Sequence, residues 1–192
     1  MDDSVAVQRS EYSRTFICID LPEEIKSSIY SMEQELPAGS VRLVSKENLH
    51  ITLVFLGDID SNKIDAVKRL IGSLNQKSFQ CSVKGLGTFS MKRPNVLFSN
   101  VLEGRDAIKN IYDQLINPLG DIGIKTESRN FIPHVTMART VNLKEKDNLI
   151  RILEENAERT FGEFLCDSII LKKSVLTGRG PMYTNLQVKL LE

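Results

Sequence analysis

The chain has 192 residues, of which 41% are hydrophobic and 26% are charged, values that are typical of a globular protein and exclude wholesale disorder. Its 25 Lys and Arg residues balance its 25 Asp and Glu residues, so the formal net charge is zero. A protein that coats long nucleic acid usually carries a basic excess, which this chain lacks, but a local pocket for a small anionic group is compatible with the composition.

The sequence contains no apolar run of the about 20 residues that cross a bilayer. Residues 1–14, MDDSVAVQRSEYSR, lack the basic, then apolar, then small-residue order of a secretory signal. We expect a cytoplasmic monomer with no membrane partner, in which residues 1–13 form a flexible N-terminal segment. Cys18, Cys81 and Cys166 lie in strand-like runs and are expected to be buried or half-buried free thiols.

Apolar patterning predicts alternating strands and helices in the first half of the chain. The first helix begins with Pro22, has Glu23 and Glu24 near its positive end, and carries an apolar stripe. The expected elements, in chain order, are a strand over 14–21, a helix over 22–36, two short strands within 41–57, a helix over 60–74 and a strand over 79–89.

The second half repeats this order, although its sequence identity to the first half is weak. The expected elements are a strand over 95–102, a helix over 104–120, a strand region over 123–140, a helix over 142–157, one strand over 161–176 and a strand over 181–192. We interpret residues 1–192 as a single domain of two similar lobes. Such lobes would pack about a pseudo-twofold axis, with their equivalent strands facing each other across a groove.

The two halves share one local pattern, NLHITL in the first and IPHVTM in the second. The chain has only two histidines, His50 and His134, and each is followed two residues later by a threonine, Thr52 or Thr136. Residues i and i+2 of a strand lie on one face, so each pair points into the same space. A single strand histidine is more often structural, but the repeated pattern favours a functional site.

Three kinds of chemistry are compatible with histidines in strands. A metal site is disfavoured because neither motif has an Asp or Glu two or four residues on, and a serine or cysteine nucleophile is disfavoured because no GxSxG motif or nearby cysteine is present. Acid–base catalysis remains, since a pKa of about 6.5 lets imidazole both accept and give a proton near neutral pH. One histidine would take a proton from water and the other would protonate the departing oxygen of a phosphate ester.

Other polar groups near the histidines suit a phosphate. The hydroxyls of Thr52 and Thr136 can donate hydrogen bonds to non-bridging oxygens, and Arg139, five residues after His134, can neutralise developing charge. A solvated arginine just past a strand end explains Arg139 equally well.

At these residues the sequence resembles the two-histidine (2H) phosphoesterase superfamily, whose signature is a duplicated HxTx motif. It is most similar to the RNA 2′,3′-cyclic phosphodiesterases, also known as the archaeal and bacterial 2′-5′ RNA ligase family. The resemblance runs from Arg14 to the C-terminus. It is carried by RTFICIDLPEEIK, ENLHITLVFLGDI, GLGTF, RPNVLF, FIPHVTMAR and the YT of PMYTNL.

The resemblance implies an α/β fold of the α+β type, with two antiparallel sheets lining a central cleft and helices on the outside. It implies hydrolysis of RNA 2′,3′-cyclic phosphate ends to 2′-phosphomonoesters without a metal or other cofactor, and in some members the joining of tRNA halves through a 2′-5′ linkage. By motif match, His50 resembles the proton donor and His134 the proton acceptor. Thr52, Thr136 and Arg139 match the phosphate-holding positions.

Four further residues are weaker candidates. Phe55 can stack on a base but is as compatible with the core, and Tyr183 can reach the phosphate or simply pack. Lys92 and Arg93 can guide an RNA backbone, although a solvated turn explains them better.

Two alternative functions stay open at this point. One is a 2H phosphodiesterase that acts on 2′-5′ oligonucleotides, ADP-ribose cyclic phosphate or other small phosphate esters. The other is a non-catalytic nucleotide- or RNA-binding module that keeps the pocket.

Overall fold

The structure is a computed structural model that describes residues 12–126, 131–178 and 180–192. Strand β1 (Tyr12–Asp20) begins at the first described residue. Residues 1–11 of the expected flexible segment 1–13 lie outside the described residues, and Tyr12 and Ser13 are the first two residues of β1.

The described residues form a mixed α/β structure whose elements follow the expected order. After β1 they are α1 (Glu23–Glu33), β2 (Val41–Leu43), the short 3-10 helix η1 (Lys46–Asn48), β3 (His50–Asp60), α2 (Ser61–Gly72), β4 (Phe79–Thr88), β5 (Val96–Val101), α3 (Arg105–Asp121), β6 (His134–Thr140), α4 (Lys146–Glu155), β7 (Thr160–Cys166), β8 (Ser168–Thr177) and β9 (Gly180–Leu190).

One expected strand, 161–176, is two strands that separate at Asp167. Strand β7 pairs with β4, whereas β8 pairs with β1, so the chain moves here from one end of the sheet toward the other. The apolar pattern continues through both strands and gives no sign of this change of direction.

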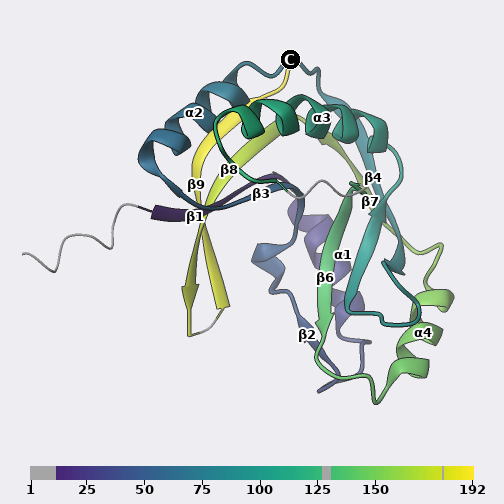
Figure 1. The fold of residues 1–192 in the computed structure, drawn as a ribbon. Helices are drawn as coiled ribbons and strands as arrows, with labels where there is room; N and C mark the ends of the chain where they lie inside the picture. Colours follow the sequence, from purple (N-terminus) through teal and green to yellow (C-terminus); the bar gives the residue numbers. More distant parts are fainter. Residues whose placement is uncertain (1–11, 127–130, 179) are drawn as a thin grey trace, which may run out of the picture.

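The strands form one sheet in the order β7-β4-β5-β6-β3-β1-β8-β9. Strand β2 pairs with the end of β6, over residues 138–140. All of the strand pairs are antiparallel, and a single residue pair, Ile51 with Val135, joins β3 to β6. The sheet is thus two halves connected by a narrow seam (Figure 1). The expected fold class is confirmed, with the refinement that the two expected sheets are continuous through this seam.

Each half of the sheet contains strands from both halves of the sequence. Strand β4 lies in the same half of the sheet as β5, β6 and β7, whereas β8 and β9 lie in the same half as β1 and β3. Helix α3 contacts β3 and lies beside α2, whereas α1 contacts β6 and β7 (Figure 1). Neither half of the sequence therefore builds a half of the molecule by itself.

The helices cover the sheet with the apolar stripes that the sequence predicts. Ile25, Ile29 and Met32 of α1 are almost fully buried, as are Ile108, Ile111 and Leu115 of α3. The three cysteines are buried and free, as expected. Within the described parts of the chain, no helix is both long and apolar enough to cross a membrane.

Candidate active site

The seam between the sheet halves brings the two histidine motifs together. Ile51 and Val135 are paired across the seam and fully buried, so their side chains define the core face. Residues on either side of a paired residue point to the opposite face of a strand. His50 and Thr52 therefore share one face with His134 and Thr136. In this register the two histidines are diagonal cross-strand neighbours, for which Cα separations of about 7–8 Å are typical.

A β-bulge in each central strand adds a further residue to this face. The register of β1 and β3 shifts between Ile17 and Cys18, which leaves Leu53 as an extra residue on β3. Leu53 and the next residue, Val54, are both buried, so the strand resumes its alternation one residue late. Phe55 consequently points to the same face as His50, and 66% of it is exposed. The alternative that Phe55 is a core residue is therefore wrong.

The same device recurs in β6. The register of β5 and β6 shifts between Leu97 and Phe98, with Met137 as the extra residue, and both Met137 and Ala138 are buried. Arg139 is thereby turned to the face of His134 and is exposed. Phe55 and Arg139, each five residues after a histidine, occupy equivalent positions in the two halves.

Both histidine rings are held by the same hydrogen bond. Nδ1 of His50 donates to the carbonyl oxygen of Asn48 at 2.7 Å, and Nδ1 of His134 donates to that of Ile132 at 2.7 Å. Because a carbonyl oxygen only accepts, Nδ1 carries the proton and the neutral ring leaves Nε2 as a free acceptor. In His50 the Thr52 hydroxyl donates to this Nε2 at 2.9 Å.

Two aromatic rings contact the imidazole of His50. Its ring centroid lies 4.9 Å from that of Phe16 and 5.6 Å from that of Tyr183, with an edge-on arrangement to the latter. Phe55 continues this group through Phe16, at 6.2 Å between centroids. Tyr183 is therefore in direct contact with the site.

His134 has a matching pair of rings. The centroids of Phe98 and Phe89 lie 5.0 and 5.1 Å from that of His134. Phe98 is buried, whereas Phe89 is 56% exposed at the end of β4. Each histidine thus contacts one buried ring, Phe16 or Phe98, and one ring that is partly exposed, Tyr183 or Phe89.

Burial makes both imidazoles weak bases in the free protein. It lowers the pKa of His50 to about 4, against the opposing effect of the hydrogen bond to Asn48. Burial also lowers the pKa of His134, against the hydrogen bond to Ile132, and the positive charge of Arg139 adds to this lowering. Burial raises the pKa of Tyr183, whose phenol is therefore neutral.

Arg139 lies within electrostatic reach of both halves, because its charge affects both His134 and Tyr183. Its cross-strand partner on β2 is Arg42, another exposed arginine, which therefore points to the same face. Among the described residues, neither guanidinium has a carboxylate within 4.0 Å. Two uncompensated arginines side by side suit an anionic ligand.

The remaining candidates differ in their relation to the histidines. Lys92 and Arg93 are exposed in the connection from β4 to β5, and in the described part of the chain no hydrogen bond or ion pair links them to either histidine. Thr136 is paired with Phe98 of β5 and lies on the histidine face.

Sequence reasoning missed Asn48, which braces the site from behind. Its side-chain amide donates to the Pro181 carbonyl at 2.8 Å and to the Ser45 hydroxyl at 2.9 Å, while its own carbonyl accepts from His50. Asn48 thus connects His50 to β9, the strand that carries Tyr183. In the sequence Asn48 stands out only by its place two residues before His50, and its burial is known from the structure.

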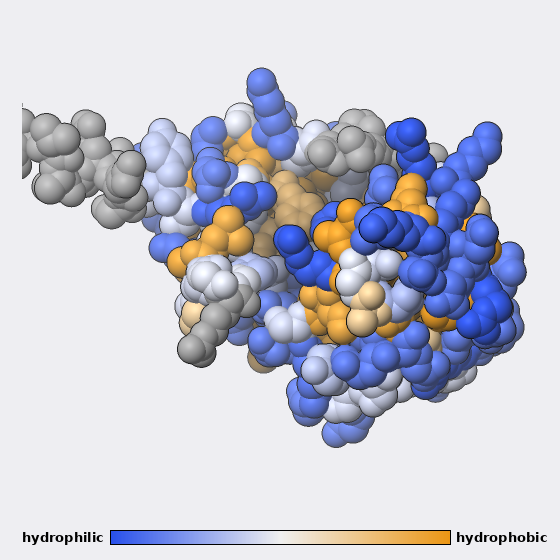
Figure 2. Space-filling model, turned by 90° about the horizontal axis from the view of Figure 1, so that it is seen from below, coloured by the Kyte–Doolittle hydropathy of each residue, from blue (hydrophilic) through white to orange (hydrophobic). Residues whose placement is uncertain are grey.

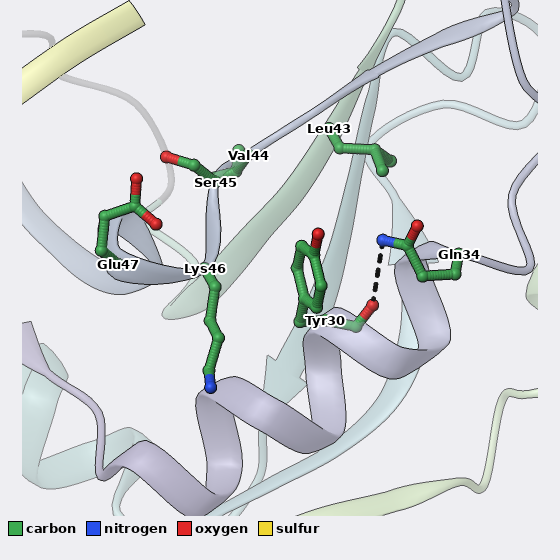
Figure 3. A pocket seen from close by; sticks show the side chains of 7 residues that line it. All are labelled: Tyr30, Gln34, Leu43, Val44, Ser45, Lys46 and Glu47. Carbon is green, nitrogen blue, oxygen red and sulfur yellow. Dashed lines mark hydrogen bonds between the residues drawn. The ribbon is translucent and has the colours of Figure 1, made fainter.

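The surface of the molecule has two hollowed regions. Seen from below, the molecule shows a hollow between the β8–β9 hairpin and the rest of the body, with hydrophobic residues within it (Figure 2). A separate surface depression of about 500 Å³ lies between α1 and the β2–η1 segment and is lined by Tyr30, Gln34 and residues 43–47 (Figure 3). None of the predicted site residues lines this depression.

The side chains of the described residues include no group of three or more His, Cys, Asp or Glu arranged to hold a metal ion. The groups on the histidine face are mainly imidazole, hydroxyl and guanidinium groups, together with the Asp20 carboxylate, which is paired with the Lys172 ammonium group. This set suits a phosphate ester better than a cation.

A bilobed α/β fold with an HxT motif at the centre of each half is the architecture of the two-histidine phosphoesterases. The sequence profile of the 2′-5′ RNA ligase superfamily matches residues 21–175. The chain therefore belongs to the 2′-5′ RNA ligase superfamily.

Curated relatives share one name across distant organisms. The chain is 34% identical over 173 residues to the RNA 2′,3′-cyclic phosphodiesterase of Methanocaldococcus jannaschii, covering 88% of this chain and 96% of that protein. It is 36% identical over 146 residues to the protein of the same name from Aquifex aeolicus, covering 73% and 77%.

Solved structures share the fold. Escherichia coli LigT in complex with 3′-AMP has a TM-score of 0.79 at 23% identity, covering 94% of this chain and 99% of that one. TT0787 of Thermus thermophilus has a TM-score of 0.76 at 23% identity, covering 93% and 97%.

Proposed function

We propose that this protein hydrolyses RNA 2′,3′-cyclic phosphate ends to 2′-phosphomonoesters by two-histidine acid–base catalysis, with no metal or other cofactor. The observation that carries this proposal is the seam, which supports the placing of both HxT pairs on one face of the sheet. The shared name of the curated relatives supports the same activity. The partner is then the cyclic-phosphate end of an RNA, including tRNA halves, and the expected setting is a cytoplasmic monomer.

In the proposed reaction His134 is the proton acceptor and His50 the proton donor. His134 takes a proton from water, and the water oxygen forms a bond to phosphorus while the bond from phosphorus to the 3′ oxygen breaks. His50 gives its Nε2 proton to the departing 3′ oxygen, which leaves a 2′-phosphomonoester. The assignment of donor and acceptor rests on the family resemblance, since the two rings have the same hydrogen-bonded arrangement.

The remaining residues are proposed to hold the phosphate and the base. Thr52 and Thr136 donate hydrogen bonds to the non-bridging oxygens, and Arg139 stabilises the charge that builds up on them. Tyr183 lines the His50 side of the phosphate, and Phe55 offers an exposed ring for base stacking.

The same geometry accommodates a ligase reaction. If the 5′-hydroxyl of a second RNA takes the place of water, the attack on the cyclic phosphate produces a 2′-5′ phosphodiester and releases the 3′-hydroxyl. This direction needs the same proton acceptor and donor, and we propose it as a secondary activity.

The test uses a nucleoside or oligonucleotide 2′,3′-cyclic phosphate in excess chelator. We expect turnover to the 2′-phosphate, identified by phosphorus NMR, and a loss of about 10²–10⁴-fold in kcat for His50→Ala and for His134→Ala. The matched control is Arg151→Ala, an exposed arginine on α4, which should keep full activity.

Three results would count against the proposal. Loss of turnover in chelator would indicate a metal-dependent reaction. Nucleotide binding without turnover would indicate a non-catalytic module, and a higher kcat/KM for 2′-5′ oligonucleotides or ADP-ribose cyclic phosphate would indicate a different substrate of the same superfamily.

A further inference from the structure

A buried ion pair lies beside one of the two histidines. Nζ of Lys172 on β8 is 2.7 and 2.8 Å from the two carboxylate oxygens of Asp20 on β1. The Lys172 side chain is only 8% exposed and that of Asp20 is 33% exposed. Burying such a pair costs desolvation energy that its own attraction often does not exceed, so stability alone explains it poorly.

The strand register aims this pair at His50. Asp20 is the direct cross-strand partner of His50 in the β1–β3 ladder, and paired residues point to the same face. Lys172 is paired with Phe16, which lies on the same face of β1 as Asp20. The Lys172 side chain therefore extends along β1 to reach Asp20. The carboxylate therefore lies on the same face as the imidazole of its cross-strand partner, and the ammonium group contacts the carboxylate.

The other half of the molecule has no such pair at the equivalent place. The cross-strand partner of His134 on β5 is the neutral Asn100, and the position opposite Phe98 that corresponds to Lys172 is Gly87. The two histidines share their hydrogen bonds and their aromatic neighbours, but only His50 has an adjacent carboxylate and ammonium.

We propose that Asp20 and Lys172 are positioning residues that tune the proton affinity of His50 with two opposed charges and so make it differ from His134. The importance of this difference for catalysis rests on the proposed function, in which the two histidines have different roles. The ammonium group disfavours the imidazolium form of His50, the carboxylate favours it, and the ion pair holds both groups in place.

Other groups near His50 do not supply this pair of charges. The titratable groups that face it from neighbouring elements are Asp20 and Cys18 on β1, Lys26 on α1, Lys172 on β8, Tyr183 on β9 and His134 across the seam. Burial raises the pKa of the Cys18 thiol to about 12, and burial also raises the pKa of Tyr183, so both are neutral. Lys26 has a smaller effect on His50 than Asp20 or Lys172 has.

The test is a histidine NMR titration of the full chain, which has only two histidines. His134→Ala and His50→Ala assign the two signals. The signal of His50 should titrate at higher pH in Lys172→Met and at lower pH in Asp20→Asn, each by on the order of one pH unit. In the double variant Asp20→Asn/Lys172→Met the midpoint of His50 should lie between those of the two single variants, and the signal of His134 should not move in any of them.

The matched control is Lys173→Met, which makes the same chemical change one residue along β8, on the other face of the strand. It should leave both titrations unchanged. If Asp20→Asn fails to fold, Lys172→Met and the double variant still decide the question. The proposal is overturned if the His50 midpoint stays fixed in Lys172→Met, or if the two single variants shift it in the same direction.

The pH dependence of kcat/KM gives a second readout. The value of kcat/KM near neutral pH should rise in Lys172→Met and fall in Asp20→Asn, because a higher proton affinity of His50 enlarges the fraction of free enzyme in which His50 is protonated and His134 is neutral. Moving titrations in a protein that does not hydrolyse cyclic phosphates would contradict the proposed function alone. Fixed titrations in an active enzyme would contradict the ion-pair proposal alone.

Discussion

The proposed reaction uses two residues, His50 and His134, whose imidazoles are both weak bases in the free protein. Burial lowers the pKa of His50 to about 4 and also lowers that of His134 below 6.5. The proposed donor must be protonated while the acceptor is neutral, and near neutral pH only a small fraction of the free enzyme is in this state. That fraction grows as the pH falls, until His134 is protonated as well.

This gives a prediction for the pH profile. We expect kcat/KM to be bell-shaped with its maximum at a pH between about 4 and 6.5, since it reports on the free enzyme. A bound phosphate anion raises both pKa values, so the profile of kcat should lie at higher pH than that of kcat/KM. Initial rates across pH 4 to 9 check this, and a flat profile or a kcat curve at lower pH would contradict it.

The candidate residues were predictable from the sequence to different degrees. Two threonines, Thr52 and Thr136, follow the histidines at an even spacing, so simple strand alternation places them correctly. Phe55 and Arg139 stand at an odd spacing, for which alternation predicts the opposite face. Only the bulges at Leu53 and Met137 turn them toward the histidines, and a bulge depends on pairing with another strand.

At the scale of elements, Asn48 connects η1 to β9 and its carbonyl orients His50. In Asn48→Ala the partly buried Pro181 carbonyl loses its side-chain donor, which typically costs about 1–3 kcal/mol when the group is left unpaired. We expect this loss in the free energy of unfolding from urea denaturation, together with a lower kcat because β9 carries Tyr183.

The control for this prediction is Asn148→Ala, which removes an exposed amide on α4 that accepts from Arg151. It should change stability by less than about 0.5 kcal/mol. Equal effects of the two substitutions would show that Asn48 has no special bracing role.

Elements were predictable where one apolar face meets one partner. The stripes of α1 and α3 gave their buried faces correctly because a helix shows its period within its own sequence. The division of 161–176 into β7 and β8 was not predictable, because both strands are apolar and differ only in the distant strands that they join.

At the scale of the whole molecule, a buried acid stands apart from the site. The Glu33 side chain, at the end of α1, is fully buried, and neither of its carboxylate oxygens has a hydrogen-bond partner among the described residues. Burial raises the pKa of Glu33 to about 8. The folded protein therefore keeps this proton at pH values where the unfolded chain has lost it.

The sign of the effect on stability follows from this difference. Between about pH 4.5 and 8 the folded state binds more protons than the unfolded state, so the contribution of Glu33 to stability falls as the pH rises through this range. Glu33→Gln is neutral at every pH. Its free energy of unfolding from urea denaturation should exceed that of the wild type by about 1–3 kcal/mol at pH 8 and differ little from it at pH 4.5. An equal effect at both pH values would contradict the assignment.

The overall architecture was predictable in its class but not in its connections. The repeated order of elements and the family resemblance indicated a bilobed α/β protein, which the structure confirms. The exchange of β4 and β8 between the halves was not predictable, since either strand could pair within its own half of the sequence. That residues 1–192 form a single domain stays a prediction.

In the proposed reaction the Nε2 atoms of His50 and His134 act on one phosphate. A crystal structure of the wild-type protein with a nucleoside 2′-phosphate would show whether they do. We expect the phosphate to lie between the two rings, with both Nε2 atoms and the Thr52 and Thr136 hydroxyls within about 3.2 Å of its oxygens. A phosphate bound elsewhere, or one that contacts a single histidine while the other remains more than one water away, would contradict it.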